Sequence, residues 1–222
     1  MVISNSQPSS VTWDYDRVEL IADGIVHAIG VSLGVAGAIV IVTANSAHTA
    51  DMPSIVIYTI GLLSMLGFSN AYNTWPITHV KWLLRRFDHS AIYVMIAGTY
   101  TPFIGHLKGD FVSIGLLIGV WLTAVVGVTL KLLLPGRFDR LAVVLYLILG
   151  WSGAVVYEPV AAALPSFSIW LLAAGGALYS AGVIFHGWQS LRFQNVIWHG
   201  FVPVAACCHY TAILYCVAYG QA

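Results

Sequence analysis

The stretch VELIADGIVHAIGVSLGVAGAIVIVTA, residues 18–44, decides the fold class of this chain. It is long enough to cross a membrane as one helix, because the hydrocarbon core is roughly 30 Å thick and needs about 20 apolar residues. Glu19, Asp23 and His27 interrupt it at intervals of four residues, so on a helix they share one face. Ionisable groups are costly in hydrocarbon and normally face the interior of a helix bundle. The stretch therefore predicts a membrane span with a functional face.

The composition of the whole chain agrees with this interpretation. Of 222 residues, 59% are hydrophobic and only 8% are charged, whereas about a quarter of the residues in soluble domains are charged. The formal net charge is zero, which gives no indication of a nucleic-acid partner. The three cysteines all lie in the last apolar segment, in no metal-binding spacing, and are predicted to be packing residues. The chain is predicted to be an all-α integral membrane protein.

A window of about 20 residues divides the chain into seven candidate spans. We expect a polar N-terminal segment, 1–17, without the apolar core of a cleavable signal peptide. A seven-helix transmembrane domain, 18–219, and a short tail, 220–222, follow it. The spans are predicted at 18–43, 54–74, 88–107, 111–133, 140–157, 167–187 and 196–219.

The basic residues predict how the bundle is oriented. If the N-terminus is cytoplasmic, eight of the nine Lys and Arg residues lie on the cytoplasmic side and only Lys108 lies outside. Cytoplasmic loops carry an excess of Lys and Arg, so the N-terminus is predicted to be cytoplasmic and the C-terminus extracytoplasmic. The eight residues are Arg17, Lys81, Arg85, Arg86, Lys131, Arg137, Arg140 and Arg192.

This orientation gathers polar side chains from several spans in the cytoplasmic leaflet. His199 has two interpretations: an imidazole ligand of a metal ion, or a member of a buried hydrogen-bond network. Asp88 follows two arginines at the predicted start of the third span, where a carboxylate commonly caps a helix N-terminus. Besides the first-span stripe, the gathered residues are Asn73, Asp88, His89, His186, Asn195 and His199.

Two runs in the third span resemble a known family. FDHSAIY, residues 87–93, and AGTYTPF, residues 97–103, are similar to the signature of bacterial hemolysin III proteins, which belong to the progestin and adipoQ receptor superfamily. The spacing of Glu19, Asp23 and His27 resembles the first-helix motif of that family, and Trp198-His199 resembles part of its last-helix motif. The resemblance implies a seven-helix, N-inside bundle in a bacterial inner (cytoplasmic) membrane, in contact with membrane lipids.

The chain departs from the family pattern at two positions. The second-span motif of the family has Ser and His four residues apart, but here Ser69 is followed by Asn73. The last-span motif has two histidines at that spacing, but here it has Asn195 and His199. The resemblance implies a zinc ion, for which His199 and Asp88 would remain as ligands, with His27 or His89 as open substitutes. Because neutral amides are weak zinc ligands, the two asparagines disfavour that metal site.

Two main functions follow from these residues. One is a zinc-dependent amide hydrolase acting on membrane lipids such as ceramides, with Ser69 and Asp88 as catalytic residues beside the metal. The other is a non-enzymatic membrane protein that responds to membrane state or binds a lipid. A proton-coupled conductor based on the first-span stripe is a third option. The sequence favours the second function and leaves protein partners open. Its polar network would comprise Glu19, Asp23, His27, Asn73, Asp88, Asn195 and His199.

Overall fold

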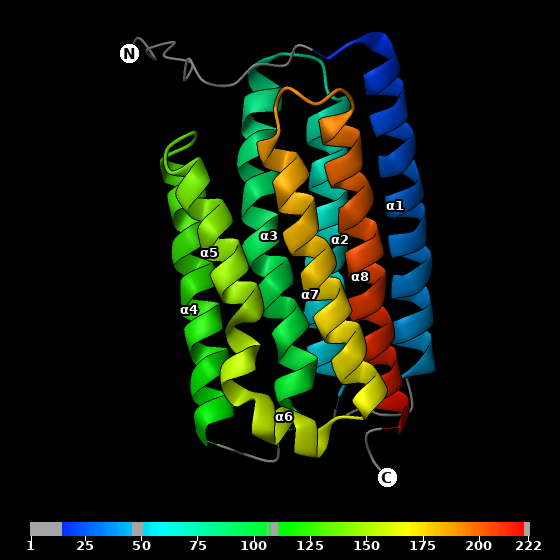
Figure 1. Ribbon diagram of the computed structural model, residues 1–222, viewed down its shortest axis with the longest axis vertical. Coiled ribbons are helices and arrows are strands. Elements are labelled where there is room, and N and C mark those ends of the chain that lie inside the picture. The colour runs from blue at the N-terminus through cyan, green and yellow to red at the C-terminus, as the bar shows by residue number, and fades with distance from the viewer. Residues whose placement is uncertain (1–14, 46–50, 106, 108–110, 220–222) are drawn as a thin grey trace.

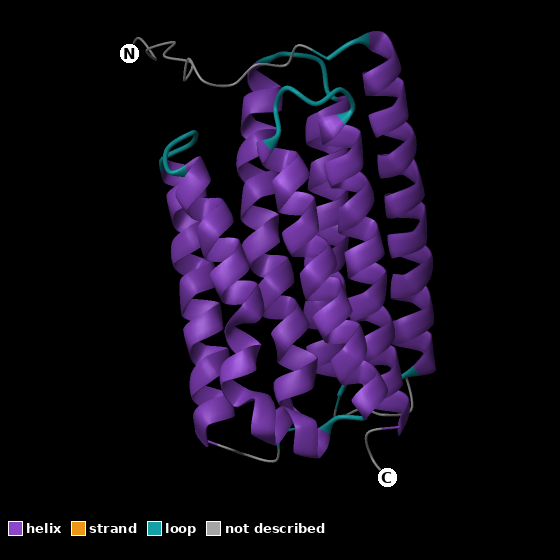
Figure 2. Ribbon diagram, in the orientation of Figure 1, coloured by secondary structure: helices purple, strands orange, loops and turns teal. Residues whose placement is uncertain are grey.

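The computed structural model describes residues 15–45, 51–105, 107 and 111–219. All regular secondary structure in these residues is helical, and long helices run side by side in one bundle, joined by short loops (Figures 1 and 2). The predicted N-terminal segment and C-terminal tail lie almost wholly outside the described residues, as does most of the predicted turn between the third and fourth spans. The all-helical prediction is confirmed.

Seven long helical segments are present in the described residues. They are α1 (Arg17–Ala44), α2 (Met52–Thr74), α3 (His79–Gly105), α4 (Phe111–Leu133), a composite segment, α7 (Ser166–Gly187) and α8 (Gln194–Tyr219). The composite segment consists of α5 (Asp139–Trp151), the 3-10 turn η1 (Ser152–Val156) and α6 (Tyr157–Ala163). Most bounds agree with the predicted spans to within two residues, but the predicted fifth span was too short and missed the break at η1.

Six of these segments are long and apolar enough to cross a membrane, and α3 is the described helix that does not meet this measure. The third span was predicted at 88–107, whereas α3 begins at His79 and carries the buried side chains of Lys81 and Arg85 in its first turns. None of the side chains from 84 to 104 is exposed. Because α3 lies inside the bundle and packs on α2, α4, α5 and α8, its surface meets protein and does not need the hydropathy of a lipid-facing helix.

The helix α1 has two faces. Ile21, Ile25, Ile29 and Leu33 are more than half exposed and form an apolar stripe. The opposite face buries Asp23, His27 and two glycines against the bundle. In a membrane the apolar stripe faces lipid and the polar groups face protein, as the sequence predicted for Asp23 and His27.

One end of the bundle, drawn at the top of Figure 1, gathers the starts of α1, α3, α5 and α8 and the ends of α2, α4 and α7. We call it the basic end, because the eight basic residues named above lie on these helix ends and their connections. Here Lys81 Nζ donates to the carbonyl oxygens of Tyr72, Asn73 and Trp75, at 2.8, 3.2 and 2.9 Å. A cation on these carbonyls completes the end of α2 and opposes its dipole.

Candidate functional site

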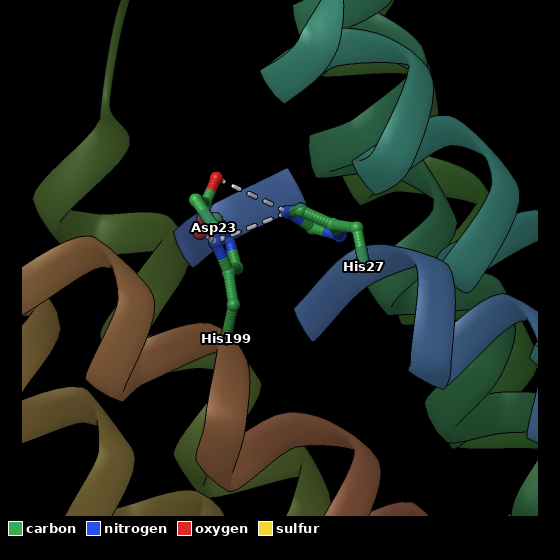
Figure 3. Close-up of side chains that lie close together, drawn as sticks. All are labelled: Asp23, His27 and His199. Carbon is green, nitrogen blue, oxygen red and sulfur yellow. Dashed lines mark hydrogen bonds and ion pairs between the residues drawn. The ribbon is translucent and has the colours of Figure 1, made fainter. Parts of the chain in front are cut away.

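A compact polar group at the basic end consists of Asp23, His27 and His199. His199 Nδ1 lies 2.6 Å from Asp23 Oδ1, and His27 Nε2 lies 3.2 Å from His199 Nδ1 and 3.5 Å from Asp23 Oδ2. Figure 3 shows the two α1 side chains converging on His199 of α8. The three residues are only 6%, 6% and 8% exposed. Two helices that are far apart in sequence therefore place one carboxylate and two imidazoles around a single point.

The first turn of α1 sets the position of α8. Asp16 Oδ1 accepts the N–H groups of Val18 and Glu19, and Glu19 Oε2 accepts the N–H of Asp16 in return, a reciprocal cap that fixes the helix start. The other oxygen, Glu19 Oε1, accepts the N–H of Phe193 at 2.8 Å. Phe193, just before α8, has a φ of 61°, a left-handed conformation that is uncommon for a residue other than glycine. The hydrogen bond to Glu19 supports this conformation.

Two groups at this junction lie outside the membrane-spanning segments and titrate differently from free side chains. The backbone N–H of Glu19 donates to Asp16 and, together with Arg192, holds the pKa of that carboxyl below its ordinary value. Burial raises the pKa of the Tyr15 phenol, whose oxygen also accepts a hydrogen bond from Gln194 at 3.3 Å. The Glu19 carboxylate, predicted to belong to the intramembrane network, is used by the α1 cap and the α8 entry.

The two asparagines, Asn73 of α2 and Asn195 of α8, lie against each other. Asn195 Nδ2 lies 3.3 Å from Asp23 Oδ2 and 3.4 Å from Asn73 Oδ1. Asn73 Nδ2 in turn donates to the carbonyl oxygen of Ser69 at 2.9 Å. These amides connect α2, α8 and α1 by hydrogen bonds, so the structure places Asn73 and Asn195 beside the Asp23 group.

Asp88 is in a different place from the one the sequence predicted. It lies in the interior of α3, well past the helix start at His79, so the predicted helix cap is wrong. Ser69 is its hydrogen-bonding neighbour, and His27 lies within electrostatic range. Asp88 and Ser69 therefore form a second polar pair, and Asp88 does not belong to the group of ligand atoms formed by Asp23, His27 and His199.

Sequence reasoning missed an ion cluster at the same end of the bundle. Asp139 accepts from Arg85 Nη2 at 2.7 Å and from Lys131 Nζ at 2.6 Å. His89, considered as a substitute metal ligand, has its Nδ1 3.9 Å from Asp139, so it belongs to this cluster. The cluster joins α3, α4 and α5. The sequence does contain a signal for this cluster, because Asp139 is an acidic residue between Arg137 and Arg140. Counting the basic residues alone gave Asp139 no role.

The comparison with known families identifies the chain. The family model described as "Haemolysin-III related" matches residues 19–210, a range that includes every helix of the bundle at least in part. The chain belongs to the haemolysin III family. It is 38% identical over 203 residues to the Hemolysin-3 homolog of Bacillus subtilis (strain 168), covering 90% of this chain and 95% of that protein.

Two further relatives extend the comparison. Hemolysin-3 of Bacillus cereus is 33% identical over 201 residues, which cover 90% of this chain and 92% of that protein. The human monocyte to macrophage differentiation factor is 29% identical over 163 residues, 71% of this chain and 67% of that protein. The resemblance inferred from the third-span signature is confirmed, and this haemolysin III protein is an integral, multi-pass membrane protein.

The zinc ion that the resemblance implies does not fit the family positions in this chain. Asn73 and Asn195 offer amides, whereas zinc prefers imidazole, thiolate and carboxylate. A different set has the right chemistry: one ligand atom each from Asp23, His27 and His199 lies within 4.8 Å of the others. This set takes two of its residues from α1 and one from α8, and none from α2.

Proposed function

We propose that this haemolysin III protein is a non-enzymatic, lipid-responsive protein of the bacterial inner membrane. The observation that carries the proposal is the amide of Asn195, which lies between Asn73 and Asp23 at 3.4 and 3.3 Å. At the two positions where the family resemblance implies zinc ligands, these amides bind each other and a carboxylate, so these two positions do not supply the water-activating ion of a metal hydrolase. Hydrogen bonds across helices are adequate contacts for stabilising a membrane bundle.

The placement of α1 suggests how lipids would act on this network. In the described residues α1 packs mainly on α2 and α8, and its outer face carries the exposed stripe of Ile21, Ile25, Ile29 and Leu33. Lipids that pack better on one arrangement of α1 will favour that arrangement, because a ligand shifts an equilibrium by its differential affinity. The bonds from Asp23 to Asn195 and His199 are the contacts that such a shift would remake.

We propose the orientation with the N-terminus in the cytoplasm. Eight of the nine basic residues belong to the basic end, and Lys108 falls in the sequence between the third and fourth spans, on the opposite side. This distribution supports the proposal through the positive-inside rule. A reporter fused after Ala222 should then be active only outside the cytoplasm, and one inserted between Lys81 and Arg86 only inside it. Activity of both reporters on one side would overturn the orientation.

The lipid response is tested with the full chain reconstituted in vesicles of differing acyl-chain length and anionic lipid content. We expect the midpoint of thermal unfolding to change with lipid composition and Asn195→Ala to reduce that change. Asn70→Ala, a half-buried asparagine of α2 outside the described network, is the matched control and should leave the lipid dependence intact. An unfolding midpoint that is independent of the lipid would contradict the proposal.

A second function is supported by the pair Ser69 and Asp88. The Ser69 side chain adjoins the Asp88 carboxyl group, with His27 in electrostatic range, an arrangement that could orient water for amide hydrolysis. The reconstituted protein is therefore assayed for release of fatty acid from ceramide. We expect no turnover. Turnover that Ser69→Ala and Asp88→Asn both abolish would replace the non-enzymatic proposal with the hydrolase.

A further inference from the structure

We propose that Asp23, His27 and His199 bind a divalent transition-metal ion of the zinc class, at a site built mainly on α1. The inference rests on the geometry of these three side chains and does not depend on the proposed lipid response. It gives this chain a metal site whose ligands differ from those that the family resemblance implies, because α2 contributes none.

The donor atoms have the chemistry and the spacing that such an ion needs. Two imidazole nitrogens and one carboxylate oxygen are a common three-ligand set for zinc, and bond lengths near 2.0–2.2 Å in a tetrahedron place ligand atoms about 3.3 Å apart. His27 Nε2 is 3.2 Å from His199 Nδ1 and 3.5 Å from Asp23 Oδ2. The two imidazoles contact different Asp23 oxygens, since His199 Nδ1 lies 2.6 Å from Oδ1. The carboxylate must therefore move away from His199 when an ion takes the place of the proton between them.

The location also favours an ion. All three residues are less than a tenth exposed, and a buried carboxylate is stabilised by a nearby positive charge. Two ring nitrogens that face each other at 3.2 Å repel through their lone pairs unless a proton or a metal lies between them. Asp23 and His27 are four residues apart on one helix, the spacing at which one helix face presents two zinc ligands.

A supporting contact orients the carboxylate. Asn195 Nδ2 lies 3.3 Å from Asp23 Oδ2, and hydrogen bonds of this kind fix metal-ligating groups and tune their basicity. Asn195, whose amide is a weak zinc ligand, would thus support the ion indirectly by holding the Asp23 carboxylate in position. Because two ligands come from α1 and one from α8, the ion would also hold α1 to the bundle at the basic end.

The test measures metal directly. The full chain, purified in detergent, is stripped with a chelator, reloaded with Co²⁺ and examined by visible absorption and elemental analysis. We expect about one ion per chain, with the intense d–d bands of a tetrahedral site. His27→Gln and Asp23→Asn should each lower the affinity for Co²⁺ by more than about tenfold, whereas Asn73→Ala should not.

His209→Gln is the matched control, because His209 is a second histidine on α8 whose Nε2 lies 3.3 Å from the carbonyl oxygen of Leu172. It should bind Co²⁺ as the unaltered protein does. If the ligand variants fail to fold, the unaltered protein still decides: chelation should lower its unfolding midpoint and Zn²⁺ should restore it. Failure of the unaltered chain to bind Co²⁺, or full binding by His27→Gln, would overturn the inference without affecting the lipid response.

Discussion

The close packing of α2 on α3 makes a sharp prediction about Gly61. A Cβ added at this position would lie 3.2 Å from Met95 Cα and 3.2 Å from the carbonyl oxygen of Val94. Both are backbone atoms of α3, so no side-chain rotation can relieve the contact. Across the interface, a Cβ on Gly98 would meet the carbonyl oxygen of Ile57 at 3.3 Å. Small residues of this kind let membrane helices approach closely.

The expected cost of Gly61→Ala follows from these contacts. Forcing an added methyl group into a packed interface costs about 1–3 kcal/mol, while replacing glycine by alanine within a helix returns roughly 0.5–1 kcal/mol. The difference is a destabilisation of up to about 2.5 kcal/mol. For a chain of this size, each kcal/mol lowers the unfolding midpoint by about 2–4 °C. We therefore expect Gly61→Ala to lower the midpoint by a few degrees.

The assay is thermal unfolding in detergent, followed by circular dichroism. Gly67→Ala is the control, because Gly67 lies on the same helix and a Cβ there would meet nothing within 4 Å. Only the helix-propensity gain remains at Gly67, so the midpoint should stay equal or rise. Gly61→Leu should destabilise more than Gly61→Ala. If Gly61→Ala behaved like Gly67→Ala, the close approach of α2 and α3 would be refuted.

Three further predictions concern charged groups at the basic end. Lys81→Met should lower the free energy of unfolding by about 1–3 kcal/mol, because three carbonyls at the end of α2 lose their donor, and the unfolding midpoint should fall with it. Lys81→Arg should recover part of the loss. Asp139→Ala should cost up to about 3–5 kcal/mol by leaving two buried cations without their carboxylate, and a midpoint within one degree of the parent would refute the cluster. The depressed pKa of Asp16 means that its stabilising contribution is present above the ordinary value of 3.8 and is lost as the pH falls through the lower folded-state pKa. Asp16→Asn should therefore flatten the dependence of the unfolding midpoint on pH in that acidic range, and an unchanged pH dependence would exclude this role.

The sequence by itself determined the class of protein and its family. Apolar length identified most of the spans because a helix that faces lipid must be apolar along its length. The third-span signature identified the haemolysin III family, and the spacing of Asp23 and His27 identified the inner face of α1. Each of these results depends on a local pattern, which is the information that a single sequence carries directly.

The tertiary structure alone decided the partners of the polar residues. Nothing local to His199 shows that its ring would meet Asp23 rather than Asp88, because the encounter depends on how α8 packs on α1. Glu19 matched the spacing of the stripe, yet the α8 entry at Phe193 determines the use of its carboxylate. Hydropathy likewise misplaced the start of α3, because a helix surrounded by protein can bury Lys81 and Arg85 wherever neighbouring carbonyls and Asp139 receive their charges. Long-range packing supplies these partners, and no pattern within one helix encodes them.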